Sequence, residues 1–405
     1  MFLSSNLSLS AQTDNSLFDY YSLSPKIGVE GYYGINSNAI TNSFTTKFLN
    51  GGFIESSFKD KVSSKLDRNN RIGSDINYGI YFSGFPDSLF GKSSISCYFG
   101  LRNREHLDLA FSEDLFNLGF YGNKRFAGDT AHLGRFNLNL LRYQQMYFGF
   151  IFNKGKYGGG LSILKGEQHL SVNAPISSLY TSPDGTYLDL DLTMDLNQSN
   201  TSNKEYWAFN GTGASADFFA VFNLNPADRK KKFLFEVKDL GFIRWNNNSM
   251  AYSIDKAYHY EGLEVKNIFQ LRDSVFAGVS RDSVIYEITV PENKSYTTIL
   301  PAFFHIAYMV DLNRKLKLVA GCKYRMLANY QFYSYIKGNY QLTKSANVQV
   351  KIAYGGYGNL NFGIGLKKYL GPKFSLALHS DNIEGYVLPA YTTGQGILLS
   401  IEKIF

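Results

Sequence analysis

Charged side chains that recur at alternate positions are the residues of this sequence most able to do chemistry. Asp189, Asp191 and Asp195 form an acidic row. A basic set recurs at similar spacing toward the C-terminus, namely Lys317, Lys323, Arg325, Lys351 and Lys367. Successive side chains of a β-strand point to opposite faces, so each row would lie on one face of a sheet.

Two kinds of chemistry are open to these rows. If both line a water-filled channel, their separated charge would select or orient a solute. If they face each other across an interior, they would pair and stabilise a mostly closed barrel. Both interpretations make the acidic and basic residues candidates for the lining of a lumen.

Motifs of covalent or metal chemistry are missing from the sequence. No two histidines lie at metal-ligand spacing, and there is no Gly-x-Ser-x-Gly nucleophile, Walker sequence or dinucleotide fingerprint. The formal net charge is +7, but Lys and Arg are dispersed along the chain, so nucleic acid is not an expected partner. We expect no enzyme activity, no catalytic residue, no metal and no cofactor.

The elements that would position these charges are β-strands. Leu360, Phe362, Ile364 and Leu366 alternate with polar residues or glycine, and similar runs of about ten residues recur to the C-terminus. At roughly 3.3 Å per residue and a steep tilt, such a strand crosses a bilayer. No apolar run approaches the 18 to 20 residues or so of a membrane helix.

A transmembrane barrel explains this alternation better than a soluble β-sandwich or another β-rich secreted protein. The polar phase is rich in Gly, Asn, Lys and Tyr, and aromatic residues make up 16% of the chain. We therefore predict an all-β fold, a transmembrane antiparallel up-and-down β-barrel of about 14 strands, with roughly 12 to 16 possible.

Residues 187–197 show the cleanest alternation of the chain. Leucine or methionine at positions 188, 190, 192, 194 and 196 opposes the acidic row. We predict a membrane strand here, with Leu192 near the middle of the bilayer and the acidic row toward the lumen.

The N-terminal part is expected to differ from the barrel. Residues 1–11 resemble the remnant of a signal peptide. Residues 12–69 would form an N-terminal segment with a possible strand at 26–36 and an amphipathic helix at 52–66. The apolar side of this helix is Ile54, Phe58, Val62 and Leu66. It would plug the lumen or lie at the rim.

Residues 70–405 would form the barrel, interrupted by two irregular segments. Residues 103–131 break the alternation, and Ser112 followed by Glu113 and Asp114 predicts a helix start, with Gly119 or Gly122 at its end. Residues 258–298 would form a long charged loop or small insertion. Either segment is a candidate constriction or docking surface.

Several short stretches carry a resemblance to known barrels: residues 48–55 (FLNGGFIE), 115–128 (LFNLGFYGNKRFAG) and 239–245 (DLGFIRW), together with the terminal Phe405. Through them the chain resembles an uncharacterised family of Bacteroidota outer-membrane proteins, with an architecture similar to the FadL-like barrels. The resemblance implies the outer membrane of a Gram-negative bacterium, and a lumen occluded by an N-terminal segment. Phe405 is similar to the signal read by the barrel-assembly machinery.

Two functions stay open, of which the resemblance implies the first. The first is a barrel that passes or binds a small hydrophobic solute, with membrane lipid and that solute as its partners. The second is a non-transporting barrel that anchors or scaffolds a secretion, gliding or surface-protein complex. An apolar pocket that reaches a gap in the wall would favour transport. A lumen packed by side chains, together with a large exposed apolar patch on the loops, would favour a scaffold.

Overall fold

The computed structural model describes residues 25–84, 95–153, 155–203, 205–224, 230–261 and 292–405. Fourteen antiparallel strands form a closed ring in which β1 pairs with both β2 and β19. In ring order the strands are β1 (Lys26–Ser37), β2 (Asn70–Ser83), β3 (Ser96–Phe111), β5 (Phe136–Phe152), β6 (Tyr157–Thr181), β8 (Gly211–Asn223), β9 (Lys231–Trp245), β13 (Phe303–Asp311), β14 (Leu316–Arg325), β15 (Tyr333–Thr343), β16 (Ala346–Tyr354), β17 (Leu360–Leu370), β18 (Phe374–Ser380) and β19 (Gly394–Ile404). The predicted barrel and its strand number are confirmed.

The ring begins at β1, so the expectation that the barrel starts at residue 70 is wrong. β1 pairs along its length with β19, from Lys26 opposite Ile404 to Asn36 opposite Gly394. The alternation of β1 is interrupted by glycine in both phases, which weakened the sequence signal. The predicted signal-peptide remnant, residues 1–11, lies outside the described residues.

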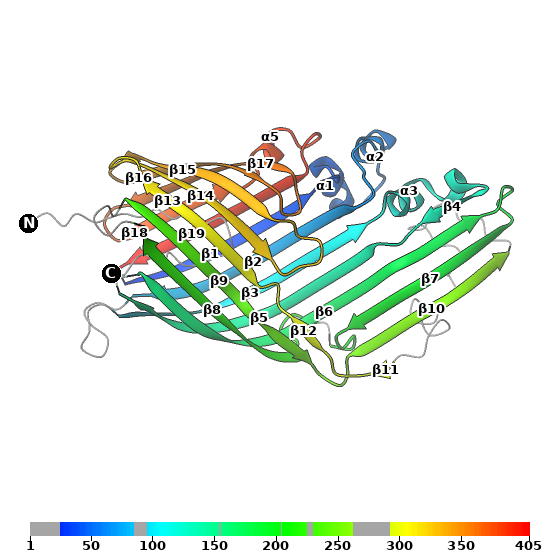
Figure 1. Cartoon of the computed structure of the whole chain (residues 1–405), viewed down its shortest axis with the longest axis horizontal. Helices are drawn as coiled ribbons and strands as arrows, with labels where there is room; N and C mark the ends of the chain where they lie inside the picture. The colour runs from blue at the N-terminus through cyan, green and yellow to red at the C-terminus, as the bar shows by residue number, and fades with distance from the viewer. Residues whose placement is uncertain (1–24, 85–94, 154, 204, 225–229, 262–291) are drawn as a thin grey trace, which may run out of the picture.

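The two ends of the ring differ in their connections. At one end the turns are short, as at residues 312–315, 344–345 and 371–373, and at the other they are long and carry the helices (Figure 1). In outer-membrane barrels the short turns face the periplasm and the long loops face outside. We call these the inner end and the outer end.

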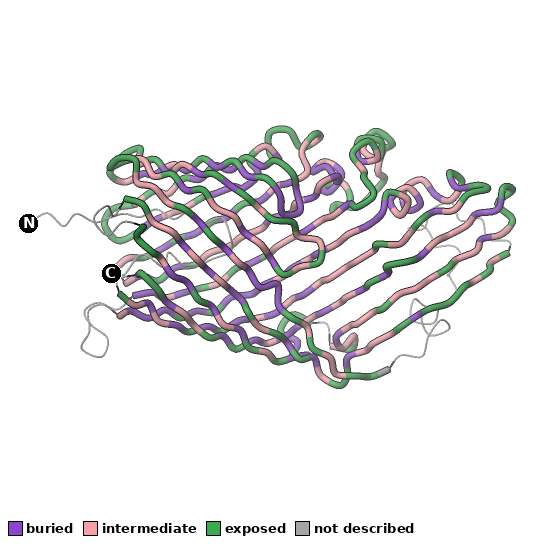
Figure 2. The backbone as a smooth tube through the Cα atoms, in the orientation of Figure 1, coloured by how far each residue is buried: buried purple, intermediate pink, exposed green. Residues whose placement is uncertain are grey.

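Alternate residues of the barrel strands are exposed or buried, as Figure 2 shows along each strand. On the outward phase, Ile80 is 51% and Val350 57% exposed, whereas the inward Tyr143 and Lys351 are 0% and 1% exposed. The outward phase is apolar and the inward phase carries the charges. This distribution fits lipid outside and an enclosed polar interior.

The 25-residue β6 continues past the ring and forms, with neighbouring strands, an extension at its outer end (Figure 1). It pairs with β5 from Tyr157 to Ala174 and with β8 from Tyr157 to Gly166, and its outer part from Leu170 pairs with β7 (Tyr187–Gln198). β7 pairs in turn with β10 (Met250–Glu261), and β4 (Asp129–His132) pairs with the tip of β6. The short strands β11 (Glu292–Asn293) and β12 (Thr297–Ile299) join β10 and β9.

Helices gather at the outer end: α1 (Asn42–Asn50), α2 (Ser56–Ser63), α3 (Glu113–Tyr121), the 3-10 turn η1 (Asn123–Phe126) and α5 (Glu384–Val387). Ser112 caps α3 by accepting a hydrogen bond from the Leu115 N–H at 3.1 Å, and Gly122, with φ +81°, ends it, as predicted. None of the described helices has the length and apolarity to span a bilayer.

The predicted amphipathic helix is present as α2, shorter than residues 52–66, and it lies at the rim. Val62 is buried beside Phe44 and Phe116, and Ile54, Phe58 and Leu66 pack around them. The same cluster includes Ile72, Leu109 and Phe111, which belong to the outward phase of β2 and β3. The helices therefore cover the outside of the wall, and α2 is not a plug of the lumen.

The irregular segment expected at 103–131 starts later than predicted, because β3 continues to Phe111. The outward positions 103 and 105 hold Asn and Glu, so the apolar alternation that marks a membrane strand disappears although the strand continues. In the segment expected at 258–298, β10 extends to Glu261, and residues 262–291 lie outside the described part.

Candidate functional site

The five predicted basic residues occupy inward positions on β14, β16 and β17. Lys323, Arg325 and Lys351 are buried inside the ring. Lys317 lies near the inner end, with Nζ 3.6 Å from Asp311, and the Nζ of Lys367 lies 2.8 Å from Glu402. The structure therefore spreads these residues along the wall instead of gathering them at one point.

The acidic row does not line the barrel, and its predicted place was wrong. Asp189, Asp191 and Asp195 are on β7, which lies outside the closed ring. Asp189 contacts His259 of β10 (Nδ1 to Oδ1, 2.5 Å), and Asp195 accepts a hydrogen bond from Ser253 at 2.8 Å. The alternation of apolar and acidic residues in β7 does not indicate which strands β7 pairs with.

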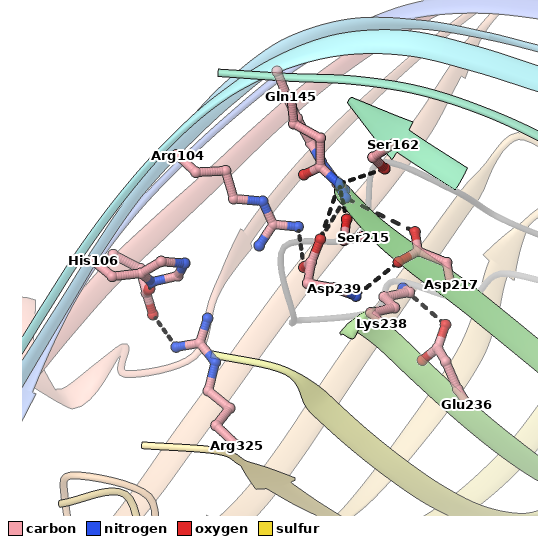
Figure 3. Close-up of polar contacts among 12 residues, drawn as sticks. Arg104, His106, Gln145, Ser162, Ser215, Asp217, Glu236, Lys238, Asp239 and Arg325 are labelled. Carbon is pink, nitrogen blue, oxygen red and sulfur yellow. Dashed lines mark hydrogen bonds and ion pairs between the residues drawn. The ribbon is translucent and has the colours of Figure 1, made fainter. Parts of the chain in front are cut away.

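One ion pair crosses the lumen near the outer end. Arg325 on β14 donates to the carboxylate of Asp75 on β2, with 2.7 Å between Nη1 and Oδ2. The ring nitrogen Nδ1 of His106 on β3 bonds to the other oxygen of that carboxylate. β14 and β2 lie on opposite sides of the ring. We call these three residues the lumen bridge; Figure 3 labels its His106 and Arg325.

A second charged network lies deeper and centres on Asp239 of β9 (Figure 3). Its carboxylate forms ion pairs with two arginines of β3, Arg104 at 2.8 Å and Arg102 at 3.1 Å. Gln145 of β5 donates to the same carboxylate at 3.1 Å and to Ser162 at 2.7 Å. Buried charges need such partners, because an unpaired charge in a low-dielectric interior is costly.

A bulge in β8 places the remaining acid of this network. The pairing of β8 with β9 shifts between Ala216 and Phe218, and the carboxylate of Asp217 accepts the backbone N–H of Asp239 at 2.7 Å. Asp239 itself has φ +54°. Sequence reasoning missed this network, since Arg104 fell in a segment predicted to be irregular and bulges leave no mark in the parity.

Aromatic side chains fill the lumen toward the inner end. Tyr81, Tyr98, Tyr147, Ile151 and Phe219 form one buried cluster. Gly149 and Gly100 make room for the Tyr98 and Tyr147 rings, which a Cβ at either glycine would strike. Where β1 pairs with β19, Glu402 forms an ion pair with Lys26 at 2.8 Å and accepts a hydrogen bond from the Tyr81 hydroxyl at 2.7 Å.

Two cavities lie on either side of the lumen bridge. The larger, about 120 Å³, is lined by His106, Asp108, Asn137, Asn139, Leu141, Ser171, Ile299, Pro301, Met326, Leu327 and Ala328. The smaller, about 60 Å³, contains Asp75 and Arg325 together with Tyr32, Asn36, Tyr330, Tyr333, Tyr357 and Asp381. Because His106 borders one cavity and its bonded partners border the other, the lumen bridge separates them.

Metal-binding chemistry has no obvious place in the described residues. No group of three or more His, Cys, Asp or Glu side chains is arranged to hold an ion there. His379 instead bonds to Asp381 at 2.8 Å, beside Lys351.

Comparisons with known proteins give one family match and several similar barrels. The model of a family of unknown function (DUF5723) matches residues 21–381. No curated protein sequence matches. Among solved structures, the toluene transporter TodX of P. putida is 9% identical, with a TM-score of 0.43, covering 94% of this chain and 90% of that one.

Two further solved structures resemble the chain at a similar level. The toluene transporter TbuX of Ralstonia pickettii is 8% identical, with a TM-score of 0.44 and coverage of 95% and 90%. A FadL homologue of Pseudomonas aeruginosa is 11% identical, with a TM-score of 0.39 and coverage of 94% and 90%.

Proposed function

We propose that this chain, which belongs to the DUF5723 family of unknown function, binds a small solute at the outer end of an outer-membrane barrel. It passes the solute inward when the lumen bridge opens and the charged network and aromatic cluster below the bridge rearrange. The observation that supports this proposal is the position of the lumen bridge, whose His106 lines the larger cavity and whose Asp75 and Arg325 line the smaller one. Parting one cross-lumen pair would join the cavities without breaking any strand pairing.

The lining of the larger cavity bears on the class of solute. Strands β3, β5 and β6 contribute polar groups such as Asn139 and Ser171, whereas Ile299, Pro301 and Met326 supply an apolar side. This two-sided lining favours an amphipathic solute, with an apolar body and a polar head. The FadL-like resemblance implied a hydrophobic solute, and the polar side of this cavity favours one that also carries a polar head.

Asp108 is the residue best placed to receive the polar head. Its carboxylate is 1% exposed, borders the larger cavity and has no ion-pair partner among the described side chains, although Tyr357 and Asn329 lie within hydrogen-bonding reach. A buried carboxylate of this kind is stabilised by a cation or by further hydrogen-bond donors. An ammonium or hydroxyl head group would supply them.

The test is conductance and uptake after removal of the lumen bridge. Arg325→Ala should raise single-channel conductance in planar bilayers severalfold over a nearly closed wild type, and speed entry of small amphipathic amines into liposomes. Lys317→Ala, which removes an ion pair at the inner end, is the matched control and should leave both unchanged. Equal conductance for wild type, Arg325→Ala and Asp75→Asn would reject the proposal.

An anchor or scaffold is the second candidate function. The filled lumen favours it, because the charged network and the aromatic cluster both lie across any path inward. The extension favours it too, since it carries paired strands beyond the bilayer. Unchanged solute uptake in a deletion strain, with a stoichiometric partner recovered in mild detergent, would support this function over transport.

A further inference from the structure

Exposed apolar side chains gather at one part of the outer rim. They come from α5 and the turn after it, and from α1 and the turn after it: Tyr386, Val387, Leu388, Tyr391, Phe48, Leu49 and Phe53. Phe53 is 79% and Val387 70% exposed, more than the barrel residues Ile80 and Val350 that face lipid. We call this set the rim surface.

The two parts of the rim surface are joined by hydrogen bonds. The N–H of Ser43 donates to the Pro389 carbonyl at 3.0 Å, and the Asn42 amide donates to the Thr392 hydroxyl at 3.0 Å. Thr41 caps α1 by accepting from the Phe44 N–H, which fixes the helix at this point. α1, α2 and the α5 loop thus form one continuous element of the rim.

The rim surface adjoins the lipid-facing band at α5, where the Glu384 carboxylate accepts the Phe362 N–H at 3.1 Å. The N–H of Ile383 donates to the carbonyl of Phe362 on β17 at 2.9 Å. Phe362 and Leu360 belong to the outward apolar phase of that strand, and Ile383 is itself exposed. On the other side, α1 and α2 rest on the outward phase of β2 and β3.

Lysines border the apolar side chains and lie over their rings. The Nζ of Lys61 is 5.3 Å from the centre of the Tyr391 ring, and Lys59 is 5.9 Å from Phe53. Lys65 donates to the Tyr391 carbonyl at 3.1 Å. An ammonium group over an aromatic ring is a cation–π contact, and lysine and aromatic side chains are both favoured at a membrane interface.

We propose that the rim surface lies in the outer leaflet, with its apolar side chains at the boundary between acyl chains and headgroups, and with Lys61 and Lys65 against the phosphates of anionic lipid. Amphipathic segments of mixed apolar and cationic character bind membranes through buried apolar area together with attraction to anionic headgroups. Continuity with the lipid-facing band identifies the occupant as lipid. The inference does not depend on solute passage.

Depth measurements by spin labelling test the placement. Val387→Cys and Phe53→Cys, each in a Cys97→Ala, Cys322→Ser background, are labelled in vesicles of phosphatidylethanolamine and phosphatidylglycerol. Both labels should be more accessible to oxygen than to a water-soluble nickel chelate. The ratio of the two accessibilities should lie between the value for Val350→Cys in the band and the value for Ala257→Cys on the extension. Accessibility equal to that of Ala257→Cys at both sites would overturn the placement and leave a surface suited to a protein.

Lipid retention tests the phosphate contact separately. Native mass spectrometry of detergent-purified protein should show at least a twofold loss of bound phosphatidylglycerol for Lys61→Glu/Lys65→Glu. Lys256→Glu on β10 of the extension is the matched control and should retain lipid like the wild type. Retention unchanged in the double variant, or lost equally in the control, would overturn the role of the two lysines.

Discussion

At the scale of single residues, the interior is organised by a few shared carboxylates. Asp239 serves Arg102, Arg104 and Gln145 at once. Removing one partner of a buried pair leaves a charge without compensation, so single substitutions here matter more than their number suggests.

Asp239→Ala should destabilise the barrel by about 3 to 5 kcal/mol, because the buried Arg104 loses its carboxylate partner and Arg102 keeps only Gln145 and Asp217. Guanidinium-induced unfolding in detergent, followed by tryptophan fluorescence, measures the change. Asp239→Asn keeps an oxygen for Gln145 and should lose less. Equal stability of wild type and the alanine variant would mean that water enters the network and solvates both arginines.

His259 provides a pH-dependent contact on the extension. Hydrogen bonds to Asp189 and then to Glu261 raise its pKa above the ordinary 6.5. A raised pKa in the fold means that the contact stabilises β7–β10 pairing below pH 6.5 and that this contribution is lost as pH rises through the raised pKa. The protection factors of the β7 and β10 amides, which are corrected for the intrinsic pH dependence of exchange, should fall over that window, and His259→Gln should remove this fall.

At the scale of strands, the alternation of apolar and polar residues predicts well which face of a strand is apolar, but it predicts poorly where the strand lies in the sheet. The outward and inward faces of β16 and β17 were predicted correctly, and so was the residue that caps α3, because these signals are local in the sequence. The place of β7 and the length of β3 depend on pairing between distant residues, which a periodic pattern does not encode. The bulges in β6 and β8 escaped for the same reason.

Two arginine substitutions separate the band from the extension. Val350→Arg, in the middle of β16, should cost roughly 2 to 4 kcal/mol, since it places a charge among acyl chains. Leu192→Arg on β7, first expected to lie in the bilayer, should cost far less. Folding yield and heat-modifiable gel mobility measure both. A greater loss at Leu192 than at Val350 would contradict the assignment of the band.

At the scale of the whole molecule, the family and the closed barrel were predictable from sequence, whereas the lumen contacts were not. Short stretches such as residues 239–245 indicated the family, and the alternation of apolar and polar residues predicted the barrel. Contacts across the lumen join strands on opposite sides of the ring, so only the closed geometry brings Asp75 to Arg325. The signal peptide, the role of Phe405 and the Bacteroidota origin stay predictions.

The lengths of the connections predict the orientation of the protein in the membrane. A cysteine at Ala257 on β10 should react with an impermeant maleimide added to intact cells, and one at Arg314 in an inner turn should react only after the outer membrane is opened. Both experiments use a Cys97→Ala, Cys322→Ser background. The opposite pattern of labelling would invert the assigned ends.

The pairing of β1 with β19 constrains how this barrel is made. The Phe405 N–H donates to the Pro25 carbonyl at 3.0 Å, so the first and last of the described ring strands meet. Until β19 has been synthesised and exported, β1 and β18 keep unpaired edges that a bilayer cannot satisfy. A polypeptide that stops before residue 394 therefore cannot close the ring, and stable insertion has to await β19.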